Sequence, residues 1–134
     1  MKRLLLAIWI GSVSTSAFAA GWVPVGNSVL RRYFVDTKSI VAPDIDPVSA
    51  WVRIDYKRDP AAKFDHALGV WEFRCQSREM RIASRTTYSK KGALIDTEQF
   101  SQAQFASIVP GSIEQAVEAM VCERSKRPPA PDRR

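Results

Sequence analysis

Apolar and polar residues alternate on both sides of a short polar break near the middle of the chain, within residues 68–88. Alternation with a period of two predicts β-strands that each turn one apolar face toward a core. We therefore expect a hairpin here, with Gln76–Glu79 as its loop. The apolar positions that define its buried face are Trp71, Phe73 and Cys75 before the break, then Met80 and Ile82 after it.

The length of the loop decides which residues of the hairpin face one another. With the loop at Gln76–Glu79, Phe73 lies opposite Ile82 and Arg74 lies opposite Arg81. The apolar pair then shares a face with the core. The two arginines repel each other on the polar face unless a carboxylate or a bound anion lies between them.

Four further segments are predicted to be strands, which gives six with the hairpin. Pro24 places the first of them at a sheet edge, because proline lacks the donor that an interior ladder needs. Asp36 follows the second, and we expect it to start a single helical turn there. The four segments are Gly21–Gly26, Arg31–Val35, Val48–Lys57 and Ala93–Thr97.

Residues 112–122 have the spacing of a helix. Ser112 is a natural N-cap, and Gln115 three positions later completes a capping box. Cys122 points about 140° away from the centre of the apolar stripe at 100° per residue. Either the last turn unwinds or the helix packs on a broader face. The stripe consists of Ile113, Ala116, Val117 and Met120.

Residues 1–19 have the layout of a secretory signal peptide, with two basic residues, an apolar run and cleavage after Ala19. The run is far shorter than the roughly 20 residues of a membrane span. Because export leads to an oxidising compartment, Cys75 and Cys122, the chain's two cysteines, are predicted to pair and to fasten the C-terminal helix to the sheet. We expect residues 20–123 to form one small domain and residues 124–134 to be a disordered, basic, proline-rich tail.

The chain has 20 basic and 14 acidic side chains, a formal net charge of +6. The leader's Lys2 and Arg3 account for two of these charges. A modest positive balance in an exported protein favours an acidic protein, glycan or lipid partner over nucleic acid.

Four arginines of the hairpin are the candidate binding residues: Arg74, Arg78, Arg81 and Arg85. They form either an anion-binding surface or a solvated face that Glu72 and Glu79 neutralise. Trp51 shares its strand face with Arg53 and Asp55, so it is either covered by the helix or a loop, or exposed as an anchor for a partner.

No pattern of residues indicates catalysis or a cofactor. His66 is interpreted as an exposed spacer in a polar loop, without a patterned acid or nucleophile beside it. Two cysteines and one histidine spread over this much sequence make a poor zinc site. We therefore expect a protein that is not an enzyme and has no metal or cofactor.

Several short motifs, in their order and spacing, resemble the surface-adhesin protein E family of bacterial envelope proteins. The resemblance covers about Gly21 to Cys122. Unlike the known adhesin, the chain has no cysteine near its predicted cleavage site for lipid attachment, and it carries the basic tail. The motifs are Trp22, Tyr33-Phe34-Val35-Asp36, Ser39-Ile40, Trp51-Val52-Arg53, Trp71-Glu72-Phe73-Arg74-Cys75, Pro110-Gly111-Ser112 and Val121-Cys122.

The resemblance implies an α+β fold: an antiparallel sheet of about six strands with a C-terminal helix packed on one face and tied to it by a disulfide. It also implies adhesion to host matrix or serum proteins such as vitronectin and laminin, and possible homodimers. We therefore expect an exported binding module in the periplasm or on the surface of a Gram-negative bacterium. The alternative is a periplasmic structural or assembly factor on the same scaffold.

Overall fold

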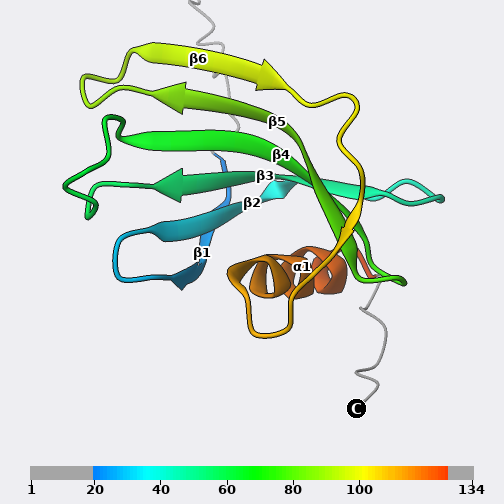
Figure 1. Ribbon diagram of the computed structural model, residues 1–134. Helices are drawn as coiled ribbons and strands as arrows, with labels where there is room; N and C mark the ends of the chain where they lie inside the picture. Colours follow the sequence, from blue (N-terminus) through cyan, green and yellow to red (C-terminus); the bar gives the residue numbers. More distant parts are fainter. Residues whose placement is uncertain (1–19, 127–134) are drawn as a thin grey trace, which may run out of the picture.

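The structure of the protein is a computed structural model that describes residues 20–126; the predicted leader and residues 127–134 lie outside this range. Six strands form an antiparallel sheet in chain order, and one helix, α1 (Ile113–Arg124), lies against one face of it (Figure 1). A short β7 (Ala106–Ser107) pairs with one end of β5. The predicted α+β fold is confirmed. The strands are β1 (Trp22–Asn27), β2 (Arg32–Val41), β3 (Val48–Asp55), β4 (His66–Arg74), β5 (Glu79–Tyr88) and β6 (Leu94–Gln99).

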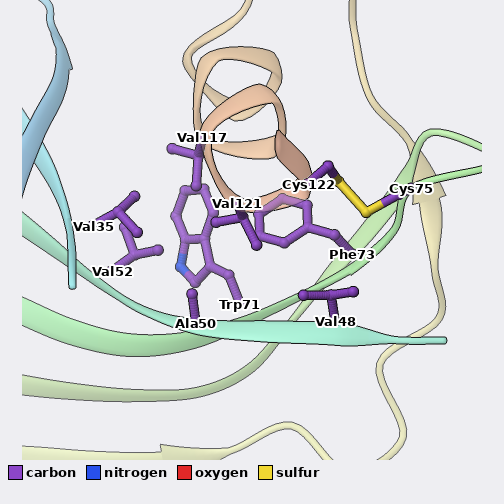
Figure 2. Packing of buried hydrophobic residues seen from close by; sticks show 10 residues of the cluster. All are labelled: Val35, Val48, Ala50, Val52, Trp71, Phe73, Cys75, Val117, Val121 and Cys122. Atoms are coloured by element: carbon purple, nitrogen blue, oxygen red, sulfur yellow. A yellow bond between two sulfur atoms is a disulfide. The ribbon is translucent and has the colours of Figure 1, made fainter. Parts of the chain in front are cut away.

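The hydrophobic core lies between α1 and the side of the sheet that faces it. Trp71 and Phe73, two positions apart on β4, both point toward the helix, as strand alternation requires. They pack beneath Val117 and Val121 of α1 (Figure 2). The other buried apolar residues of this layer are Val35, Val48, Ala50 and Val52.

The predicted disulfide is present and fully buried. It joins Cys75, just after β4, to Cys122 in the last turn of α1, with a Cα–Cα distance of 5.9 Å. The helix stays regular through Arg124, so its last turn does not unwind. Of the two arrangements that the sequence left open, the structure has the broader face. Val117 of the predicted stripe is fully buried, whereas Ile113, Ala116 and Met120 are only partly buried. The buried residues of the helix are Val117, Glu118, Val121 and Cys122.

The N-terminus of α1 is capped at the predicted residue. Ser112 Oγ accepts a hydrogen bond from Gln115 N at 3.2 Å. The Gln115 side chain bonds back to the N–H of Gly111, one residue before the position that a capping box would use. The pair fixes the start of the helix at the end of the short loop that arrives from β7.

The predicted register of the central hairpin is wrong by two residues. Its loop lies before Glu79, so Phe73 faces Met80 and Glu72 faces Arg81. A shift of two keeps every side chain on its predicted face, which explains why the apolar pattern could not reveal it. The register places opposite charges across the ladder instead of two arginines, and cross-strand pairs of this kind are stabilising.

The predicted helical turn at Asp36 is also wrong, because β2 continues to Val41. Asp36 Oδ1 instead accepts hydrogen bonds from the N–H groups of Gly21, at 2.8 Å, and Lys38, at 3.1 Å. The carboxylate thereby ties the edge strand β1 to β2 and sits at a break in the β2–β3 register.

A carboxylate is buried in the helix–sheet interface. Glu118 is 1 % exposed, and its Oε1 lies 3.9 Å from Nε of Arg78 in the hairpin loop, without a hydrogen bond in the described structure. Burial raises the pKa of Glu118 above its ordinary value, and the positive charge of Arg78 opposes only part of that rise.

Removing the disulfide is expected to lower the free energy of unfolding by about 4 kcal/mol, because the bridge closes a loop of 47 residues in the unfolded chain. Urea denaturation of residues 20–134 carrying Cys75→Ala and Cys122→Ala measures this loss. Reduced wild-type protein is the control and should lose a similar amount. A loss below about 1 kcal/mol in both would contradict the prediction.

The buried carboxylate gives stability a specific pH dependence. Since the folded-state pKa of Glu118 is raised, its contribution is fully present below the ordinary carboxyl pKa and is lost as the pH rises through the folded-state pKa. Relative to Glu118→Gln, the wild type should lose unfolding free energy as the pH is raised from about 4 to about 8. Urea midpoints of both proteins across this range test it; a constant difference would contradict it.

Candidate functional site

The side of the sheet opposite α1, here called the open face, has no described helix or strand packed on it (Figure 1). Trp51 lies on this face because its neighbour in β3, Val52, points into the core. Its side chain is 40 % exposed, so the interpretation that the helix or a loop covers it is wrong. The alternative, an exposed aromatic side chain on the surface, is what the structure has.

Aromatic residues of the neighbouring strands share the open face with Trp51. In the sheet ladder, Trp22 of β1 and Trp51 of β3 stand on either side of Asp36 of β2. Trp22 and Phe34 line a shallow hollow of about 220 Å³ together with Arg53 and Asp55. The open face therefore combines half-exposed rings with charged groups, a composition typical of protein-binding surfaces.

Two of the four candidate arginines lie together. Arg74 and Arg81 both stack on Phe105, with their guanidinium carbons 3.9 and 4.6 Å from the ring centroid. Each also forms an ion pair across the hairpin, Arg74 with Glu79 and Arg81 with Glu72. This cluster is therefore held in place by carboxylates and a ring, and its positive charges are partly compensated.

The other two candidate arginines lie elsewhere. Arg78 faces the helix and pairs with the buried Glu118. Arg85 pairs with Glu98 of β6, with Nε 2.9 Å from Oε2, in an exposed ion pair. The structure thus divides the four arginines among three sites instead of one continuous surface.

The interpretation of His66 as an exposed spacer is wrong. It is the first residue of β4, only 17 % of its side chain is exposed, and its ring stacks on Tyr88 with 4.7 Å between centroids. Its Nδ1 lies 2.7 Å from Asp65 Oδ2, and this hydrogen bond lowers the pKa of Asp65. No serine or cysteine nucleophile bonds to the ring in the described structure, and residues 20–126 contain no cluster of three acidic, cysteine or histidine residues placed to hold a metal.

Three contributors to these surfaces were missed in the sequence. Phe105 was not among the candidate residues, yet its ring is the platform on which Arg74 and Arg81 stack. Trp22 and Phe34 were noted only as parts of strands. Their place beside Trp51 depends on strand register, and the alternation with Val35 and Val52 is the signal that could have found it.

The family comparison agrees with this fold. A family model described as surface-adhesin protein E matches residues 22–123. The chain belongs to the surface-adhesin protein E family. Neither the curated proteins nor the solved structures contain a match. Among residues 20–126, no helix has the length and apolar content needed to cross a membrane.

If the open face is free, Trp51 should contribute little to stability while Trp71 contributes much. Trp51→Ala is expected to change the free energy of unfolding by less than about 1 kcal/mol, because little packing is lost on an uncovered face. Trp71→Ala, the matched control in the core, should cost about 3–5 kcal/mol. Urea denaturation of both variants decides; equal losses would show that Trp51 is covered.

Proposed function

We propose that this chain is an exported protein of the bacterial envelope that binds a protein partner and carries out no reaction. Membership of the surface-adhesin protein E family supports a role in adhesion. The buried disulfide supports export, because such bonds persist in oxidising compartments. The partner class is a host matrix or serum protein.

The observation that carries the proposal is the exposed Trp51 on the open face. An aromatic side chain that leaves 40 % of its surface in water does little for the fold, yet tryptophan is among the residues that contribute most at protein interfaces. Trp22 and Phe34 on neighbouring strands extend the apolar area around it. A rigid sheet presents these rings without ordering a loop, which limits the entropic cost of binding.

The Arg74–Arg81 cluster would act as a polar rim of this interface. Its side chains are already ordered by Phe105 and by their glutamate partners, so little rotamer freedom is lost when a partner's carboxylate approaches. Ion pairs at a rim change the rate of association and partner choice more than affinity. We therefore assign most of the affinity for the partner to the aromatic residues, and the orientation of the bound partner to the arginines.

Binding of residues 20–134 to immobilised vitronectin and laminin tests the proposal. Trp51→Ala should weaken binding about tenfold or more, and Arg81→Glu should slow association with a smaller loss of affinity. Val109→Ala removes a side chain that is 68 % exposed outside the open face, and it serves as the matched control with unchanged binding. The proposal is contradicted if the wild type binds neither vitronectin nor laminin, or if all three variants lose the same amount of affinity.

The location of the protein is tested on intact bacteria. An adhesin on the outer surface is cleaved by added protease, whereas a periplasmic structural or assembly factor is cleaved only after the outer membrane is opened. Protection on intact cells would favour that alternative and remove host proteins from the possible partners.

A further inference from the structure

The helix-facing side of the sheet is not fully covered. The strands extend past the first turn of α1 (Figure 1), and beside that turn the structure has a groove of about 610 Å³. Strands β2 to β5 form its floor, and the segment after β6 forms a wall that includes Phe100 and Ala103. Sites for small molecules commonly have volumes in this range.

The floor of the groove is apolar. Ile54, Trp71 and Ile82 line it from three adjacent strands, and a smaller hollow that shares these residues continues over Gly69. A Cβ atom at Gly69 would lie 2.6 Å from the Ser84 carbonyl oxygen and 3.5 Å from Nε1 of Trp71. A larger residue would therefore clash here, and glycine leaves this part of the floor without a side chain. The floor can therefore take up an elongated apolar group.

One end of the groove is cationic. The guanidinium of Arg31 lies 5.0 Å from the ring centroid of Tyr56, and Arg85 lines the same groove. Both arginines act on the Tyr56 hydroxyl, since both lower the pKa of that group, although burial outweighs them and raises it. Within residues 20–126, Arg31 has no carboxylate ion-pair partner. Arg31, Arg85 and the phenol of Tyr56 thus line the groove together, and of the two guanidinium groups Arg85 is already paired with Glu98.

We propose that this groove binds a long-chain fatty acid, with its alkyl chain on Ile54, Trp71 and Ile82 and its carboxylate on Arg31. An extended peptide fits less well, because the backbone groups of the floor already bond within the sheet and the peptide's amides would lose water without gaining partners. An alkyl chain has no polar group to satisfy. Glu114 on the rim disfavours a phosphate, which carries more negative charge than a carboxylate.

Calorimetric titration of residues 20–134 with decanoate, dodecanoate and tetradecanoate, each below its micellar concentration, tests the alkyl part of the site. Affinity should rise about three- to fourfold for each added methylene. Dodecyltrimethylammonium has the same chain with a positive head and should not bind, and dodecyl phosphate should bind more weakly than dodecanoate. No binding of any carboxylate, or equal binding of the cation, overturns the proposal.

A matched pair of charge reversals tests the head-group site. Arg31→Glu should weaken dodecanoate binding about tenfold or more. Arg32→Glu makes the same change one residue later, where the side chain stacks on Phe34 of the open face, and it should stay within about twofold of wild type. Both residues are exposed, and unchanged melting temperatures verify folding. Equal effects of the two variants overturn the assignment.

The groove and Trp51 lie on opposite sides of the sheet, so variants of Trp51 and Arg31 separate the two proposals, whereas Arg81 also lines the groove and cannot separate them. Trp51→Ala should leave dodecanoate affinity unchanged, and Arg31→Glu should leave binding to matrix proteins unchanged. A loss of fatty-acid binding in Trp51→Ala with an unchanged melting temperature would show that the alkyl chain lies on the wrong face.

Discussion

The buried bond between Cys75 and Cys122 is the constraint on which the rest of the structure depends. It fixes the last turn of α1 to the end of β4, and the rest of the helix then crosses the sheet from that point. Because a single helix covers a single face, the position of the bridge also decides which face of the sheet remains uncovered. A small domain buries a modest fraction of its surface, so one covalent link of this kind contributes a large share of its net stability.

This arrangement gives the sheet two unlike surfaces. On the helix side, the core occupies the region under α1, and the strands that extend beyond it form the floor of a groove with Arg31 at one end. On the open face, the rings of Trp22, Phe34 and Trp51 stand among charged residues with no described layer over them. Both surfaces are rigid because the same continuous ladder of strands supports them.

The sequence predicted the strands, the helix and the buried face of each more accurately than it predicted which residues pair across neighbouring strands. The strands, the capped helix and the disulfide followed from alternation, the Ser112 cap and the presence of two cysteines. The hairpin register failed because a shift of two residues leaves the apolar pattern unchanged, and only the cross-strand partners of Arg74 and Arg81 distinguish the two registers. The predicted apolar stripe did not place Glu118 in the interface, because the helix packs on a face that also includes Glu118 and Cys122.

Ion pairs within the protein explain why the number of arginines in a segment does not identify an anion-binding site. Each of the four candidate arginines lies beside a glutamate of the same chain, and an anionic ligand would have to compete with these carboxylates. Arg31 was not a candidate residue in the sequence, yet its guanidinium stacks on Tyr56 at an apolar groove and forms no ion pair within residues 20–126. An arginine without a carboxylate partner can pair with an anionic ligand without first breaking an ion pair within the protein. The start of β2 is therefore a better candidate for an anion site than the hairpin.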